Sequence, residues 1–186
     1  MVEKVSANRY GWVMERRNRE YLPTVLGVFA LVAVYAVVND QFIAAIAPTH
    51  FTVYHPHYFP FDQAWAQALC FAFVATTGPG LVWGMLLYWA GRFGRAPVIG
   101  RRVLVLGAGM VILMTTAAAW GEGWKVAHTG ITPYPKFFYP VEDDGLNVTQ
   151  TVQLTNYLIG AAGAFVWLFL VWAWRIWHSP PAEPAK

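Results

Sequence analysis

Long apolar stretches separated by short polar segments dominate the hydrophobic pattern of this chain. A helix needs about 20 mostly apolar residues to cross the hydrocarbon core of a bilayer. Four stretches meet that requirement, at residues 22–46, 63–89, 103–120 and 149–177. The pattern therefore predicts an all-α integral membrane protein, with a bundle of four transmembrane helices over residues 22–178.

The two ends of the chain differ from these spans. Residues 1–21 contain WVMERRNREY, which mixes bulky apolar side chains with Arg and Glu. We expect an amphipathic segment lying along the inner membrane surface. Residues 179–186, SPPAEPAK, are rich in Pro and Ala, and we expect a disordered tail. The first apolar run is long for a signal peptide, so we expect a retained helix.

Composition supports the membrane class. The chain is 57% hydrophobic and 12% charged, whereas soluble domains carry about 25% charged residues. The single cysteine, Cys70, falls inside the second span, so no intrachain disulfide can form.

The Lys and Arg residues predict an orientation. Of the 13 Lys and Arg, all but two lie before the first span, between the second and third, or at and beyond the inner end of the fourth; the two exceptions are Lys125 and Lys136. By the positive-inside rule both termini are cytoplasmic (N-in, C-in). The other two loops would face the periplasm or exterior of a bacterial inner membrane. This rule accounts for the net charge of +3 without a nucleic-acid partner.

Small residues indicate where the helices pack. Close approach of helices in lipid depends on glycine and similar residues. The candidates for helix packing are Gly80, Gly84, Gly107, Gly160 and Gly163. In the fourth span, Thr149, Gln153, Asn156, Gly160, Gly163 and Trp167 share one stripe, which should face another helix. Pro79 predicts a kink in the second span, and we favour a packed kink over a cavity or hinge.

The outer loops carry the candidate chemistry. In HFTVYHPHYFPFD, residues 50–62, His55 and His57 flank Pro56. In an extended segment their two imidazoles would lie on the same side. The candidate metal ligands are His50, His55, His57, Asp62, Glu122 and His128. Such a set suits copper, zinc or iron. The alternative is an aromatic loop at the membrane interface, whose histidines bind water or backbone. No b-type haem is expected, because no span has a central histidine.

Three further features complete the outer face. Residues 121–145 contain Pro133, Pro135 and Pro140, which favour an extended or turning path folded over the bundle as a lid. Within them, Glu142, Asp143 and Asp144 are expected to form a solvated turn. Asp40 should lie near the outer interface, where a carboxylate costs little, and an intramembrane proton site is not favoured.

Two segments resemble known membrane proteins. NDQFIAAIAPTHFTVYHP, together with VTQTVQLTNYLIG, resembles small bacterial four-helix membrane proteins of unknown function, and that resemblance implies no activity. NDQF and FTVYHPHYFPFD are loosely similar to the third subunit of the copper membrane monooxygenases, which has an Asp and two His near the membrane surface. The Asp-x-x-x-His arrangement of that subunit is absent here, so its activity is not carried over.

Three functions are consistent with the sequence. The first is a non-catalytic subunit or scaffold, with other membrane subunits or further copies of the chain as partners in the lipid bilayer. The second is a metal-binding redox or oxygenase-type subunit with its site at the outer face. The third is a small transporter or channel, suggested by Pro79 and the polar stripe, which would have to oligomerise because four spans are few for a monomeric carrier.

Overall fold

A computed structural model describes residues 2–94 and 96–179, with side chains from Arg19 onward. Its helices are α1 (Val2–Ile46), α2 (Thr49–Thr52), α3 (Ala64–Arg92), α4 (Arg101–Thr129), a 3-10 turn η1 (Lys136–Phe138) and α5 (Asp144–Trp177). Within those residues all regular structure is helical. Four segments are long and apolar enough to cross a membrane: Arg19–Ile46, Ala64–Arg92, Arg101–Thr129 and Asp144–Trp177. This confirms the predicted all-α fold with four helices of spanning length.

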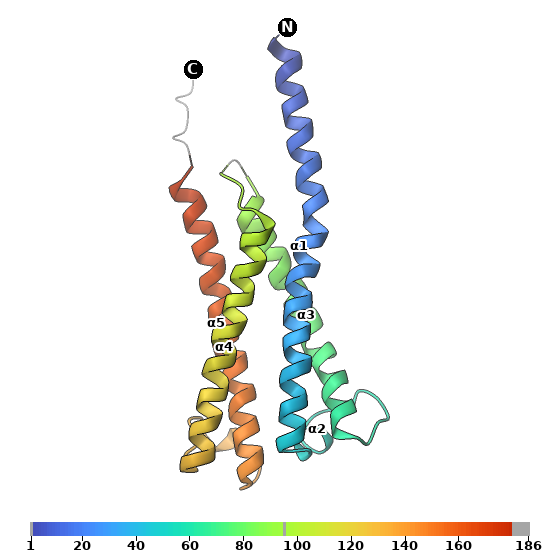
Figure 1. Ribbon diagram of the computed structural model, residues 1–186, viewed down its shortest axis with the longest axis vertical. Coiled ribbons are helices and arrows are strands. Elements are labelled where there is room, and N and C mark those ends of the chain that lie inside the picture. The colour runs from blue at the N-terminus through green and yellow to red at the C-terminus, as the bar shows by residue number, and fades with distance from the viewer. Residues whose placement is uncertain (1, 95, 180–186) are drawn as a thin grey trace.

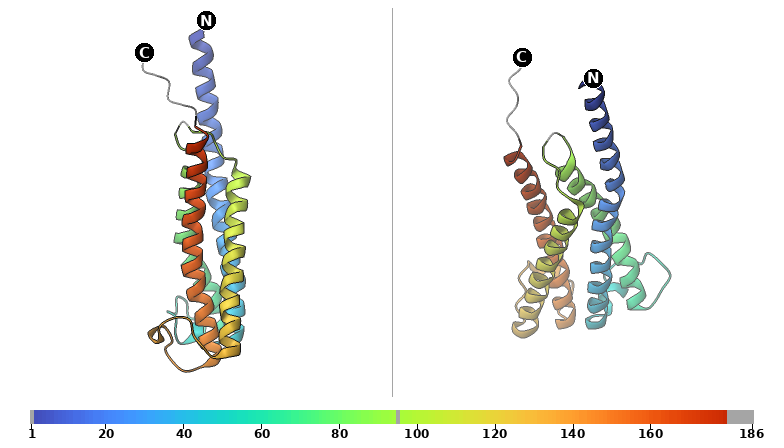
Figure 2. Two further views of the ribbon diagram at one scale, coloured as in Figure 1. Left: turned by 90° about the vertical axis from the view of Figure 1, so that its left-hand side faces the viewer. Right: turned by 45° about the horizontal axis from the view of Figure 1, so that its top comes forward.

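The four long helices form two antiparallel pairs (Figures 1 and 2). Helix α1 packs mainly on α3, and α4 packs mainly on α5. The start of α1 and the end of α5 lie at the same end of the bundle, together with the α3–α4 connection. We name this the basic end, because Arg92, Arg101, Arg102 and Arg175 lie there. The opposite end, which carries α2, is named the His50 end.

Glycines set the distance within the first pair. A Cβ added at Gly84 would lie 2.8 Å from the carbonyl oxygen of Val25 and 2.9 Å from its Cα, so α3 meets the backbone of α1 there. A Cβ at Gly80 would lie 3.1 Å from the Phe29 ring. At Gly84 a larger residue does not fit without moving the helices apart, whereas at Gly80 the Phe29 side chain would have to shift.

Glycines also contact large side chains in the second pair. A Cβ at Gly107 would lie 2.1 Å from the Trp167 ring, and one at Gly163 would lie 2.8 Å from Val111. At Gly160 the nearest atom, on Thr115, is 3.6 Å away, an ordinary contact distance. The stripe on α5 thus faces α4 at these positions, while its outer part, Thr149 and Gln153, is buried.

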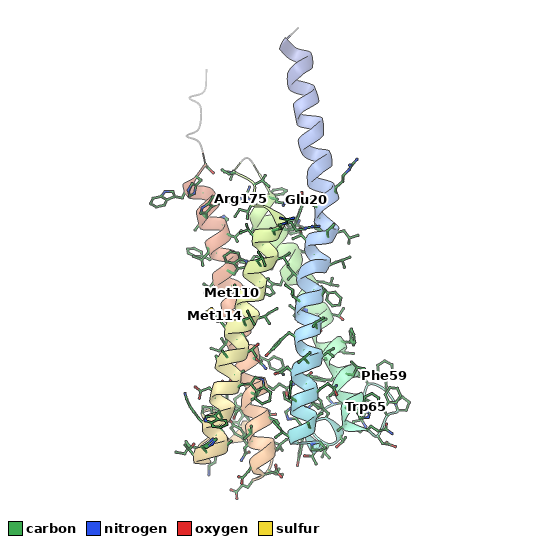
Figure 3. All side chains as sticks on the ribbon, in the orientation of Figure 1. Glu20, Phe59, Trp65, Met110, Met114 and Arg175 are labelled. Atoms are coloured by element: carbon green, nitrogen blue, oxygen red, sulfur yellow. The ribbon has the colours of Figure 1, made fainter. Side chains whose placement is uncertain are left out.

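Two buried arginines close the basic end. Arg92, on α3, forms an ion pair with Glu20 of α1. Arg175, on α5, donates four hydrogen bonds to backbone carbonyls at the end of α3 and in the following loop. Figure 3 shows Arg175 and Glu20 at the same end of the bundle. Since Arg175 comes from α5 and the Ala90 carbonyl from α3, this arginine ties the two pairs together.

The connection between α4 and α5 is shorter than the sequence suggested. Helix α4 continues to Thr129 and ends where Gly130 adopts a left-handed conformation with φ 66°. The segment 121–129 contains no proline, and Glu122 pairs with Lys125 at 2.5 Å one turn along. Asp143 caps α5, accepting a hydrogen bond of 2.7 Å from the Leu146 amide, so one member of the acidic triplet starts a helix.

The remaining loop folds back along α5 at two tyrosines. The Tyr134 hydroxyl lies 2.7 Å from Thr155 Oγ1, and the Tyr139 hydroxyl lies 2.9 Å from Thr151 Oγ1. At the chain ends, residues 2–21 continue α1 as one helix with the first span. Whether they lie on a membrane surface stays a prediction. The tail expected at 179–186 falls outside the described residues from position 180 onward.

Candidate functional site

A cavity of about 350 Å³ lies between the two helix pairs and is lined by all four long helices. Most of its wall is apolar, with Val32 of α1, Trp83 of α3 and Ala164 of α5 among the lining residues. Towards the His50 end the lining becomes polar, with Asp40 and Gln153. The cavity is thus a mostly apolar chamber inside the four-helix bundle, with hydrogen-bonding groups at one end.

The polar end is organised around Asn39. Its side-chain oxygen accepts hydrogen bonds from Trp120 Nε1 at 3.1 Å and from Asn156 Nδ2 at 3.4 Å. Its own amide donates to Asp40 Oδ1 at 3.1 Å. The Tyr35 hydroxyl donates to Asn156 Oδ1 at 2.5 Å. This network joins α1, α4 and α5, so it holds both helix pairs in a fixed relation around the cavity.

His50 is fully buried beside this network. The short helix α2 brings it inward, because the neighbouring Phe51 is buried in an apolar cluster with Ile43 and Val152. His50 Nε2 lies 2.5 Å from Gln153 Oε1, and His50 Nδ1 lies 3.0 Å from Thr149 Oγ1. An amide oxygen can only accept, so a neutral His50 carries its proton on Nε2 and presents Nδ1, an acceptor, to the Thr149 hydroxyl.

The next histidine stacks on the first. The rings of His50 and His55 lie 4.6 Å apart at an angle of 22°, and His55 Nδ1 donates to the His50 carbonyl at 2.8 Å. Burial, reinforced by the charge of His55, lowers the pKa of His50 from 6.5 to about 4. Burial also lowers the pKa of His55, against hydrogen bonds to His50 and Gln153 that raise it. Both imidazoles are therefore neutral at pH 7.

The lowered pKa of His50 predicts a loss of stability in mild acid. Below pH 6.5 the unfolded chain binds a proton at this position that the folded chain does not bind until about pH 4. Protonation then favours unfolding, so the free energy of unfolding falls as the pH falls through this window. Between pH 7.5 and 5 we expect a loss of about 2 kcal/mol, measured by denaturant titration of the protein in detergent.

The matched control for this effect is His50→Gln. Glutamine keeps hydrogen-bonding groups at the position but does not titrate, so the free energy of unfolding of this variant should change much less between pH 7.5 and 5. His57→Gln, at an exposed position, should keep the wild-type profile. Equal profiles for the wild type and His50→Gln would contradict the assignment of the effect to His50.

The other candidate metal ligands lie apart from this pair. His57 Nε2 donates to the Thr52 carbonyl at 2.8 Å, and Asp62 is exposed. Glu122 pairs with Lys125, and His128 donates to the Trp124 carbonyl at 2.8 Å on the surface of α4. Among the side chains of residues 19–94 and 96–179, no three of His, Cys, Asp or Glu converge in a way that could hold a metal ion. A metal site stays a prediction without a ligand cluster to support it.

The α2–α3 loop and the first turn of α3 are strongly aromatic and exposed. Tyr58, Phe59 and Trp65 have 44%, 49% and 60% of their surfaces exposed. Phe59 and Trp65 lie to the side of the bundle at the His50 end (Figure 3). Side chains of this kind are typical of the interface between lipid and water. This placement is consistent with the alternative of an interfacial loop.

The sequence did not reveal the cavity. We favoured a packed kink at Pro79, but Pro79 and Thr76 both line the open space. Thr76 Oγ1 donates to the Ala72 carbonyl at 2.5 Å, so the threonine supports the helix next to the proline. The expected position of Asp40 near the outer interface stays a prediction, but only 5% of its surface is exposed and it lines the cavity. The available signal was the pair of Asn39 and Asp40 facing the polar stripe of α5.

The cavity residues and the two stacked histidines are the basis on which a function can be assigned to this chain. Comparisons with protein-family models, with curated proteins and with solved structures find no match.

Proposed function

We propose that this protein binds a small lipid-soluble molecule in the cavity between its helix pairs. The observation that supports the proposal is the cavity itself, at about 350 Å³. Ligand sites in proteins measure about 300–1,000 Å³ and combine mostly apolar walls with a few placed polar groups. A chamber of this size and lining suits a molecule with one ring or a short chain and one polar end.

The position of the cavity favours entry from the bilayer. Tyr157 lines the cavity and has 53% of its surface exposed, on a helix that would face lipid. Pro79 and Ala161 also line the cavity and are exposed. The wall thus reaches the surface that lipid would cover. A ligand dissolved in the membrane could reach the cavity without crossing water.

Orientation is part of the same proposal. The basic end carries Arg101 and Arg102, both exposed, whereas Lys125 and Lys136 lie at the His50 end. The positive-inside rule then favours the basic end in the cytoplasm and the His50 end in the periplasm or exterior, in a bacterial inner membrane. The acidic residues Glu142, Asp143 and Asp144 lie at the His50 end, in keeping with this orientation.

The other functions expected from the sequence stay predictions. A scaffold role depends on partner subunits. A carrier role would use the same cavity but requires a second opening and oligomerisation. Binding is the function that the cavity supports directly, so it is the one we place first.

Filling the cavity tests the proposal. Ala164 lines the cavity from α5, and Ala162, on the same helix, is exposed and does not line it. We expect Ala164→Phe to weaken binding of 4-phenylbutan-1-ol about tenfold or more, because the new ring occupies the ligand's space. Binding would be measured by calorimetry of the protein in nanodiscs of zwitterionic lipid, with empty nanodiscs subtracted.

The control is Ala162→Phe, which adds the same ring on the side that lipid would cover. It should bind the alcohol as the wild type does, and circular dichroism should show the same helix content for all three proteins. If Ala164→Phe binds as well as the wild type, the molecule does not occupy this cavity and the proposal fails.

A further inference from the structure

We propose that Asp40 makes the cavity selective for ligands whose polar end is a protonated amine. This inference rests on the proposed function and adds the chemical class of the ligand. It depends on three observations: the carboxylate is buried, the packing of the bundle does not use it, and no cationic side chain lines the cavity.

Asp40 is buried in the membrane-spanning part of α1. It lies six residues before Ile46, about 9 Å from the end of the helix, and only 5% of its surface is exposed. An acidic side chain at such a position is costly, and in membrane proteins it usually marks a path or a binding site for an ion or ligand. A buried carboxylate therefore needs a partner that compensates for its loss of hydration.

The packing of the helices does not supply that partner. Among the described side chains, Asp40 accepts a hydrogen bond from Asn39, its neighbour on the same helix. The bond joins α1 to no other helix, unlike the bonds that Asn39 itself makes to Trp120 and Asn156. A role as a cross-link between helices therefore does not account for the carboxylate. Its side chain lines the cavity instead.

The rest of the polar end is already paired. Asn156 uses its oxygen for Tyr35 and its amide for Asn39, and Gln153 uses its oxygen for His50 and its amide for Tyr157. No Lys, Arg or His is among the described residues that line the cavity. An anionic ligand would meet the Asp40 carboxylate without a cation to bind it, so the charge of the site opposes it.

A protonated amine suits each of these features. Its N–H groups can donate to the carboxylate oxygen that Asn39 does not occupy, and charge-assisted hydrogen bonds of this kind are the strong ones. The rings of Tyr35, Tyr157 and Phe71 also line the cavity, and aromatic faces attract cations. The apolar part of the ligand would extend towards Trp83 and Ala164 at the other end of the cavity.

Three probes with the same apolar part and different polar ends test the inference. They are 4-phenylbutylamine, 4-phenylbutan-1-ol and 4-phenylbutanoate, titrated at pH 7 into the full chain in zwitterionic nanodiscs, with empty nanodiscs subtracted. We expect the wild type to bind the amine about tenfold more tightly than the alcohol, and the carboxylate most weakly. In Asp40→Asn the preference for the amine should disappear, with binding of the alcohol unchanged within about threefold.

Asp62→Asn is the matched control, because Asp62 is an exposed aspartate in the α2–α3 loop. It should bind the three probes in the same order of affinity as the wild type. A wild-type protein that binds the amine and the alcohol equally would overturn the inference and leave the proposed function standing, and so would an Asp40→Asn variant that still prefers the amine. If all three probes bind Ala164→Phe as they bind the wild type, the proposed function fails and the inference with it. The order of the three probes in the wild type decides the inference even if Asp40→Asn does not fold.

Discussion

Gly84→Val is expected to lower the free energy of unfolding by about 3 kcal/mol or more, because it places a branched side chain where α3 touches the backbone of α1. A Cβ at this position would already lie 2.8 Å from the Val25 carbonyl oxygen and 2.9 Å from its Cα. Backbone atoms cannot move away by a change of rotamer, as the atoms of a side chain can. The two helices must therefore move apart, and the contacts along the whole α1–α3 pair weaken together.

Gly80 and Gly121 provide a graded comparison for this prediction. At Gly80 the nearest atom belongs to the Phe29 ring, which can rotate, so Gly80→Val should cost less than Gly84→Val. Gly121 is exposed on α4 with nothing within 4 Å of an added Cβ, and Gly121→Val should be close to neutral. Titration with sodium dodecyl sulfate, with unfolding followed by circular dichroism, gives the order of the three variants in free energy of unfolding. Equal costs at positions 84 and 121 would contradict the close backbone contact.

The sequence predicted the class of the fold because the length of an apolar run is a local property. The four spans are visible without knowing which helices meet. The extra two turns of α4, up to Thr129, could not be seen in the same way, since residues 121–129 are too polar to count as part of a span. The sequence signals for a helix over these residues are the absence of proline and the position of Gly130 at its end, and both are weaker than hydrophobicity.

The candidate site was predicted only in part, because its residues meet through contacts between distant segments. His50 was singled out for its chemistry, but its burial depends on Phe51 turning α2 into the bundle and on Thr149 and Gln153, about 100 residues away. The polar stripe on α5 was recognised, and the residues that it would contact were not. Hydrophobic periodicity shows which face of a helix is polar without identifying its partner.

The two helix pairs are joined at both ends of the cavity. At the His50 end, His50 from the first pair binds Thr149 and Gln153 of α5. At the basic end, Arg175 of α5 binds the end of α3. Packing within each pair does not depend on these contacts, but the separation between the pairs does. The width of the cavity, and hence what it can hold, therefore depends on these two polar contacts together with the Asn39 network that joins α1 to α4 and α5.

Arg175→Ala should remove the contact at the basic end and lower the free energy of unfolding by about 4 kcal/mol. Its guanidinium donates to the carbonyls of Ala90 and Pro97 at 2.7 Å, Phe93 at 2.8 Å and Ala96 at 2.9 Å. Hydrogen bonds from a charged donor contribute about 1.5–3 kcal/mol each. We expect less than their sum, because the loop can bind water once the arginine is gone.

The conservative variant separates charge from geometry at this position. Arg175→Lys keeps the charge, but an ammonium lacks the planar fork of N–H groups with which the guanidinium reaches four carbonyls. It should therefore recover less than half of the lost free energy of unfolding. Arg101→Ala and Arg102→Ala remove exposed arginines at the same end and should change stability by about 0.5 kcal/mol or less. Hydrogen exchange adds a local measurement, since Arg175→Ala should speed exchange in residues 90–104 and leave the amides around His50 unchanged. If exchange near His50 rises by the same factor, the two ends open together, and the separation between the helix pairs does not have two independent supports.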